Sequence, residues 1–307
     1  MLPEADLSLS PHAIDTEEMW PARGQSRLWR GLRTNPTFWA GGVLVGFVLL
    51  AGLIGPYFAP HDPTVQFNDG ISIIGAPLGH TAKFPLGTDF EGRDVLSRLL
   101  YGARLSLAIS ILGNGLAVLV GVVLGAAAGW WRGWTERIIM RITDVMLAFP
   151  SLLLALALVG INGPSLGVIV VVIGMVSWTA LCRITFGQVI SLREREWIDA
   201  ARATGVGSIR ILLKQILPHL VAPITVYATL GVALTVVFEG SLAYLGLGVP
   251  TPAPSWGRMI HDAADPNALQ FYWLLLFPSL ALFITVLGFN LLGDALRDAV
   301  DPHGPGR

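Results

Sequence analysis

The sequence has 307 residues, of which 53% are hydrophobic and only 13% are charged, and its mean hydropathy is +0.63. Soluble proteins carry about 25% charged residues, so this composition excludes a disordered tail protein, a coiled coil and an ordinary water-soluble enzyme. The net charge of −1 gives no overall reason to bind nucleic acid, and the single cysteine, Cys182, excludes a disulfide framework. An integral membrane protein remains.

Uncharged stretches predict six transmembrane helices, because about 20 helical residues cross the ~30 Å hydrocarbon core of a bilayer. The uncharged run 145–182 is too long for one span, and Asn162-Gly163-Pro164-Ser165 divides it into two helices. We therefore expect an all-α bundle whose spans lie within residues 34–60, 105–131, 138–161, 166–186, 215–238 and 266–293.

The distribution of positive charge predicts the orientation of the bundle. If the N-terminus is cytoplasmic, 15 of the 20 lysines and arginines fall in cytoplasmic segments and five fall outside. Positive residues concentrate on the cytoplasmic side, so both termini are expected there. The expected organisation is a tail (1–35), a first transmembrane helix (36–60), an extracytoplasmic region (61–104), a five-helix core (105–295) with a cytoplasmic loop (188–218), and a C-terminal tail (296–307).

Common enzymatic motifs are missing from the sequence. It has no Gly-x-x-x-x-Gly-Lys-Ser/Thr loop to hold ATP phosphates, no His-Glu-x-x-His and no Gly-x-Ser-x-Gly. The pairs His61-Asp62 and His261-Asp262 could ligate a metal but are better explained as solvated turn residues. We expect no catalytic residues, no metal and no cofactor in this chain.

Glycines at intervals of four predict close helix packing. Gly42 and Gly46 share one face of the first span, and Gly121, Gly125 and Gly129 share one face of the second. Small residues at this spacing let helix backbones approach one another within lipid.

Glu239 is the most unusual charge, because it follows 24 uncharged residues of the fifth span. Ionisable groups at membrane depth are unfavourable and tend to face a cavity or a partner. Glu239 is therefore a candidate for the translocation path of a transporter, and the alternative is a structural cap at the outer end of its helix.

The loop between the fourth and fifth spans predicts a helical hairpin. A first helix runs from about Glu194 with Trp197, Ile198 and Ala201 on one face, and a second follows a Ser208 cap. Gly205 between them suits a left-handed turn. Such a hairpin can dock a partner protein or lie on lipid headgroups, and the residues favour both about equally.

This loop resembles the EAA loop of inner-membrane subunits of bacterial ABC importers. That motif is Glu-Ala-Ala-x3-Gly with an Ile-x-Leu-Pro ending thirteen residues after the glycine; here it reads Asp199-Ala200-Ala201, Gly205 and Ile216-Leu217-Pro218. Asp199 replaces the usual Glu, and Gln215 occupies the position of the usual Ile.

Further stretches are similar to the C-type permease subunit of dipeptide and oligopeptide importers, a six-helix type I ABC importer bundle. They are the stretches 59–63, 86–107, 239–250 and 254–257, and the resemblance covers about residues 36–300. It implies a multi-pass protein of the bacterial inner membrane.

The resemblance implies partners and a mechanism. The chain would pair with a B-type permease, receive peptide from an extracytoplasmic binding protein, and couple to two cytoplasmic ATPases that bind the ATP and Mg. The coupling residues would be Glu196, Asp199, Ala200, Ala201, Arg202, Gly205 and Ile209.

Two other functions remain as alternatives. Permeases for nickel complexes or glutathione in the same family look much alike. A proton-coupled secondary transporter would need intramembrane carboxylates, for which only Asp144 and Glu239 come close. An intramembrane hydrolase is disfavoured further, because the nucleophile and metal motifs are missing.

Overall fold

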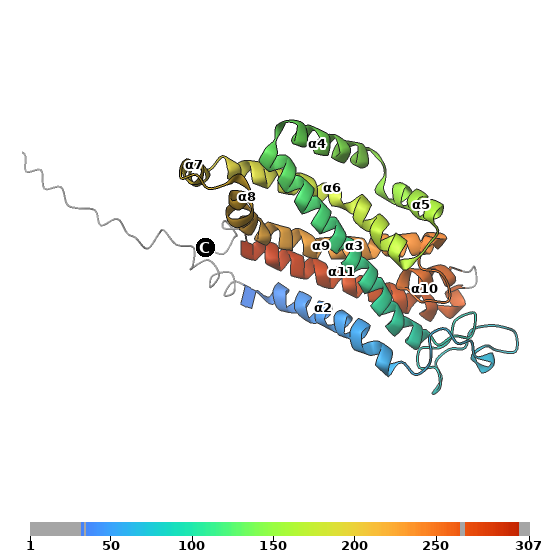
Figure 1. Cartoon of the computed structure of the whole chain (residues 1–307). Coiled ribbons are helices and arrows are strands. Elements are labelled where there is room, and N and C mark those ends of the chain that lie inside the picture. The colour runs from blue at the N-terminus through green and yellow to red at the C-terminus, as the bar shows by residue number, and fades with distance from the viewer. Residues whose placement is uncertain (1–31, 34, 265–267, 301–307) are drawn as a thin grey trace, which may run out of the picture.

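The structure, a computed structural model, describes residues 32–33, 35–264 and 268–300, so nearly all of the expected N-terminal tail and residues 301–307 lie outside it. Within these ranges five helices are long and apolar enough to cross a membrane, and a bent helix pair makes a sixth span if it is counted as one. The expected all-α bundle is confirmed: the long helices run side by side (Figure 1), and the described part contains only isolated β-bridges. The helices are α2 (Pro36–Ile54), α3 (Val95–Trp131), α4 (Gly133–Ala148), α5 (Ser151–Asn162), α6 (Leu166–Arg193), α7 (Glu196–Ala203), α8 (Ser208–Ile211), α9 (Leu217–Leu242), α10 (Trp256–Asp262) and α11 (Trp273–Val300).

The second span begins earlier than its hydropathy indicates. Asp94 caps α3 by accepting a hydrogen bond from the backbone N–H of Ser97 at 3.0 Å, so the helix begins at Val95 rather than near residue 105. Its first turns contain Arg98, which is 2% exposed. A charged residue lowers the hydropathy of a segment even when its side chain is buried in the folded protein. The hydropathy of the sequence therefore does not indicate that these turns belong to the helix.

The third span is broken, which corrects the expected single helix over 138–161. α4 and α5 meet at an angle of 91°. Phe149 between them is extended, with ψ of 138°, and Pro150 follows it. A residue before proline is driven out of the helical region, so the chain bends there.

The glycine face of α3 packs against α6, as its spacing predicts. A Cβ added to Gly121 would lie 2.8 Å from the carbonyl oxygen of Trp178, and one added to Gly125 would lie 2.4 Å from that of Cys182. The two helices therefore form the tightest pair of the bundle.

Gly42 and Gly46 face no helix of this chain: a Cβ added at either position has no neighbour within 4 Å. The packed face of α2 instead contains Gly41, close to the backbone of Leu292, and Gly52, close to Leu107. Two glycine faces exist on α2, and only the neighbouring helices decide which one is covered.

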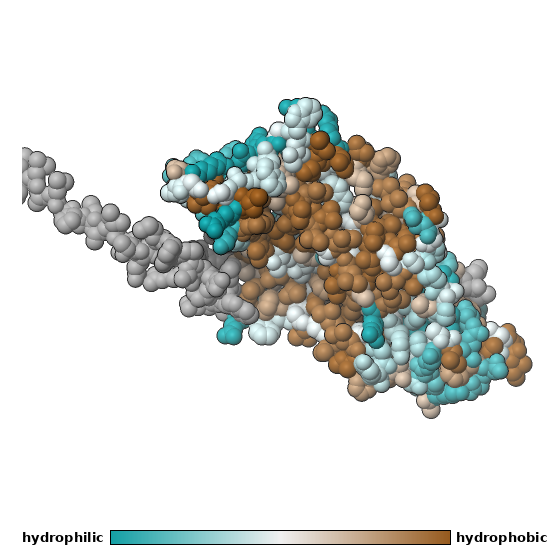
Figure 2. All heavy atoms as spheres, viewed as in Figure 1, coloured by the Kyte–Doolittle hydropathy of each residue, from teal (hydrophilic) through white to brown (hydrophobic). Residues whose placement is uncertain are grey.

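Side chains divide the molecule into three zones (Figure 2). A hydrophobic band covers the middle of the bundle, and hydrophilic side chains gather at its two ends. One end carries α7 and α8, and the other carries α10 and the segment between α2 and α3 (Figure 1). This pattern is that of a helical bundle that spans a bilayer.

Candidate coupling hairpin and buried carboxylate

The expected hairpin is present at the end of the bundle where α6 ends and α9 begins. Its first helix, α7, begins at Glu196 rather than at Glu194, because Glu194 and Arg195 form a turn after α6. The second helix is not capped by Ser208: the N-cap is Gly207, and Ser208 is the first helical residue and makes no capping hydrogen bond.

Gly205 ends α7 in the left-handed conformation that the sequence predicts, with φ of +79°. The backbone N–H of Val206 donates to the carbonyl of Ala201 at 3.1 Å, and that of Gly205 donates to the carbonyl of Arg202 at 3.0 Å. This pair of hydrogen bonds is a Schellman motif, in which the residue with positive φ is favourably glycine. The turn directs the chain back toward the bundle.

One face of α7 attaches the hairpin to the bundle. Ile198 is fully buried and packs in a cluster with Val189 of α6 and Leu220 of α9. Of the residues expected on this face, Ala201 is half-buried, while Trp197 stays 39% exposed and stacks on His219, with ring centroids 5.3 Å apart. The hairpin is therefore fixed to the membrane-spanning helices by apolar packing.

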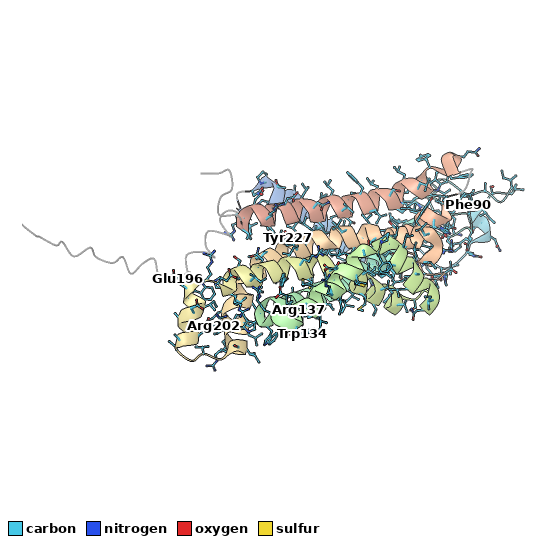
Figure 3. The ribbon with its side chains drawn as sticks, turned by 90° about the horizontal axis from the view of Figure 1, so that it is seen from above. Phe90, Trp134, Arg137, Glu196, Arg202 and Tyr227 are labelled. Atoms are coloured by element: carbon cyan, nitrogen blue, oxygen red, sulfur yellow. The ribbon has the colours of Figure 1, made fainter. Side chains whose placement is uncertain are left out.

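Most of the residues that the resemblance assigns to coupling lie on the exposed surface of the hairpin. Those that are exposed are Glu196, Asp199, Ala200, Arg202, Gly205 and Ile209. Figure 3 shows Glu196 and Arg202 together at this end of the molecule. Arg202 pairs with Asp199 at 3.1 Å, one turn apart on α7. This exposed surface of the hairpin thus combines small side chains with an ion pair, and a partner protein can reach it.

Glu239 lies in the last turns of α9 and is 1% exposed. Its polar neighbours are the hydroxyls of Ser106 in α3 and Ser255 at the start of α10. Neither carboxylate oxygen makes a hydrogen bond of standard geometry within the described part. The side chain is enclosed between three helices of the same subunit.

Both serines already accept a backbone hydrogen bond. Ser106 Oγ accepts from the N–H of Trp256 at 3.1 Å, and Ser255 Oγ accepts from the N–H of Arg258 at 3.2 Å. A hydroxyl that accepts one bond keeps its proton to donate, and Glu239 is the buried acceptor beside it. The sequence did not indicate this cluster, because its members come from three distant segments. The one feature that the sequence alone could have suggested is Ser255 as the N-cap of a helix.

The described residues contain no group of three or more histidine, cysteine, aspartate or glutamate side chains arranged to hold a metal ion. The ring of His261 instead donates to the carbonyl of Tyr244 at 2.6 Å, and Asp62 accepts from the backbone N–H of Thr64 at 2.8 Å.

Comparison with known families identifies the class of protein. Residues 121–303 match the family described as the binding-protein-dependent transport system inner membrane component. Residues 26–75 match the N-terminal transmembrane domain of oligopeptide transport permease C.

Individual relatives cover most of the chain. It is 39% identical to the di/tripeptide transport system permease protein DppC of Pseudomonas aeruginosa, over 89% of this chain and 90% of that protein. It is 44% identical to the dipeptide transport system permease protein DppC of Alkalihalophilus pseudofirmus, over 73% of each. It is 38% identical to the glutathione transport system permease protein GsiD of Pectobacterium atrosepticum, over 89% of each.

A solved structure shares the fold. A chain of the methionine ABC transporter MetNI, determined in inward-facing conformations, aligns with 66% of this chain and 96% of its own length, with a TM-score of 0.56 and 17% identity. The family match covers more than half of the sequence, and the permease relatives cover nearly all of it. The chain therefore belongs to the inner membrane components of binding-protein-dependent transport systems, as a multi-pass membrane protein.

Proposed function

We propose that this chain is the C-type permease subunit of an ATP-driven importer of dipeptides or oligopeptides in the bacterial inner membrane. The observation that carries the proposal is the hairpin, which presents the Asp199–Gly205 motif on an exposed face held by buried Ile198. The peptide permeases among its relatives support the substrate class.

The subunit forms half of a translocation pathway with a B-type permease. An extracytoplasmic binding protein delivers peptide to the end that carries α10, and two ATPases bind at the end that carries α7 and α8. The chain itself catalyses no reaction, and the ATP and Mg belong to the ATPases. Closure of the ATPases acts on the permease only if they bind its two conformations with different affinity.

The coupling contact is proposed for Glu196, Asp199, Ala200, Ala201, Arg202, Gly205 and Ile209. The small alanines allow close approach of a partner surface, and the ion pair of Asp199 with Arg202 supplies polar groups beside them. Ile198 is buried among residues of α6 and α9, so a displacement of α7 by the ATPases is transmitted to those spanning helices. In this proposal the hairpin end lies in the cytoplasm, and both termini are on that side.

Glu239 contributes to the translocation path indirectly in this proposal. Its carboxylate is enclosed between α3, α9 and the start of α10, so it positions α10 rather than touching solute. A shift of α10 would change the outer end of the pathway.

Uptake by the reconstituted transporter tests the function. The transporter is reconstituted into proteoliposomes from the chain, its partner permease, the ATPases and the binding protein. These proteoliposomes should accumulate labelled dipeptide only when ATP is present on the side of the membrane where the ATPases are bound. Glutathione is the second candidate, because a glutathione permease is 38% identical to this chain. Saturable uptake of glutathione without uptake of dipeptide would assign glutathione as the substrate. Uptake that persists in proteoliposomes without the ATPases would contradict the proposal of an ATP-driven importer.

A further inference from the structure

The second half of α6 presents a polar surface. Its exposed residues between positions 177 and 191 are all small or polar, and they are Ser177, Ala180, Arg183, Gly187, Gln188 and Ser191. In the first half of the helix the large exposed side chains are apolar, namely Leu166, Val171 and Met175. A helix surface in contact with lipid exposes apolar side chains, so the polar surface faces something other than hydrocarbon.

Arg183 of this surface lies at membrane depth. A Cβ added to Gly125 of α3 would lie 2.4 Å from the carbonyl oxygen of Cys182, so Arg183 is level with Gly125. α3 continues beyond Gly125 and ends at Trp131, which is 53% exposed. These six helical residues span about 9 Å along the axis. Exposed tryptophans concentrate at the level of the lipid headgroups, so Arg183 lies on the hydrocarbon side of that level.

An ion pair joins α4 to the polar surface. Arg183 donates from Nη2 to Oδ1 of Asp144 at 2.6 Å, and the two side chains are 53% and 48% exposed. The preceding residues of both helices are in contact and buried: Oγ1 of Thr143 lies 3.9 Å from Sγ of Cys182. Figure 1 shows α4 beside α6 at one edge of the bundle. Asp144 has a short side chain that does not reach the headgroups from this depth, so the pair stays within the membrane.

The pair leaves much of its hydrogen-bonding capacity unused. A guanidinium group has five N–H donors and a carboxylate has two acceptor oxygens, whereas the contact between Arg183 and Asp144 joins one nitrogen to one oxygen. Arg141, one turn before Asp144 on α4, is also exposed and makes no ion pair with a described residue. Groups of both charges are therefore accessible at this place.

A pathway that two permease subunits share runs along the surface of each of them. Its lining is exposed when one subunit is considered by itself, it is polar enough to be wetted, and it lacks bulky side chains. The polar surface of α6 has these three properties. A peptide has a carboxylate at one end and an ammonium group at the other, and these groups match a guanidinium group and a carboxylate.

We propose that the polar surface of α6 lines the solute pathway, where Arg183 binds the carboxylate and Asp144 binds the ammonium group of a peptide in transit. This inference rests on the proposed import of peptides and names residues that contact the solute. The two side chains exchange their contact with each other for contacts with the two ends of the peptide. Binding therefore stays weak, and the solute is released again.

The reaction of an introduced cysteine with a membrane-impermeant methanethiosulfonate tests the proposal. The sample is the assembled transporter in lipid nanodiscs, and labelling of this chain is measured. The variant Ala180→Cys places a thiol on the polar surface, one turn before Arg183. The native thiol of Cys182 is buried, so the wild type gives the baseline.

Val123→Cys on α3 is the matched control. Val123 lies between Gly121 and Gly125, which approach the carbonyls of Trp178 and Cys182 on either side of Ala180, so the two introduced thiols lie at similar depth. Val123 is 56% exposed and belongs to an apolar stripe of α3 with Leu112 and Leu119. We expect this stripe to face lipid.

The thiol of Ala180→Cys should react, because water fills the pathway, whereas a thiol in lipid stays protonated and unreactive. Dialanine at about ten times its half-protecting concentration should slow the reaction at position 180 about tenfold. Asp144→Asn with Arg183→Gln removes two charge-assisted contacts, which weakens peptide binding at least about tenfold, so the same dialanine should then slow the reaction only about twofold. N-acetyldialanine amide, which has neither charge, should not slow the reaction.

Four results would overturn the proposal. They are no reaction at position 180, which would mean that lipid or the partner permease covers the surface; equal reaction at position 123; no protection by dialanine; and equal protection in the double variant. If the double variant does not assemble, protection by N-acetyldialanine amide as strong as that by dialanine is the overturning result. ATP-driven uptake of dialanine by the wild type is measured in parallel. With that uptake present these results overturn the pathway site alone, and without it the proposed importer is contradicted instead.

Discussion

Arg98 of α3 donates from its guanidinium group to the carboxylate of Asp262 in α10, 3.2 Å away, although 164 positions separate them in the chain. Arg98 is 2% exposed, and its second partner is Asp89 at 3.3 Å. Asp89 in turn pairs with Arg93 at 2.7 Å. These contacts join the segment before α3, the beginning of α3 and α10 into one rigid end of the bundle.

Asp262→Asn should destabilise this end, because a buried arginine then loses one of its two carboxylates. Removing a partner from a buried ion pair is strongly unfavourable, and the remaining Asp89 limits the loss to about 2 kcal/mol. The measurement is the thermal unfolding temperature in detergent. The matched control is Asp69→Asn, whose carboxylate is 64% exposed and pairs with Lys83 at the surface; its unfolding temperature should stay close to that of the wild type, because exposed ion pairs contribute little to stability. Equal effects of the two variants would contradict the prediction.

Gly125→Ala should weaken the pairing of α3 with α6. The added Cβ would lie 2.4 Å from the carbonyl oxygen of Cys182, and relieving such overpacking is unfavourable by about 1–3 kcal/mol. Gly115→Ala on the same helix is the control, because its Cβ meets nothing within 4 Å and alanine is the better helix former. Thermal unfolding should separate the two, with Gly115→Ala no less stable than wild type.

Gly205→Val should impair coupling while leaving insertion of the chain intact. The φ of +79° at Gly205 is strained for a β-branched residue by ~1–3 kcal/mol, although no atom lies within 4 Å of the added Cβ. Gly207→Val is the control, since its surroundings are equally open and its φ is −62°.

ATPase co-purification and peptide uptake, measured in parallel, should fall for Gly205→Val and not for Gly207→Val. Ala201→Arg, which places a large charge on the half-buried side of α7, should resemble Gly205→Val. Normal co-purification, hydrolysis and uptake in both hairpin variants would show that the hairpin is not the coupling element.

Glu239→Ala should lower peptide uptake about tenfold while ATPase co-purification stays normal. It removes the buried carboxylate that lies beside the hydroxyls of Ser106 and Ser255, and a buried polar group left without a partner is unfavourable by about 1–3 kcal/mol. Glu239→Gln keeps an acceptor oxygen and should retain uptake within about twofold. Thr235→Ala is the control on the same helix, because its hydroxyl bonds only to the carbonyl of Gly231. Loss of uptake in Glu239→Gln as severe as in Glu239→Ala would indicate that the charge itself acts in transport.

Reporter fusions test the orientation of the chain. A reporter active only outside the cytoplasm should be active after Gly79 and silent after Gly207, because 15 of 20 positive residues fall on the expected inner side. The opposite pattern would reverse the proposed sites of ATPase and binding-protein contact together.

Features that depend on a single segment could be predicted from the sequence. Twenty apolar residues in a row must form a helix within lipid, because no water is present to satisfy an irregular backbone, and this requirement gives the number of spans. The positive φ of Gly205 is equally local, since it arises from one residue between two amphipathic segments. The presence of the hairpin and the position of its glycine turn therefore follow from the sequence alone.

Features that depend on which helices meet could not be predicted. The sequence offered Gly42 and Gly46 as a packing face, yet α11 and α3 cover Gly41 and Gly52. Glu239 has its polar neighbours on α3 and at the start of α10. The buried Arg98 of α3 forms an ion pair with Asp262 of α10. Helical periodicity defines which residues share a face, but it carries no information about the neighbour. Burial and pairing between distant segments are therefore decided only when the bundle assembles.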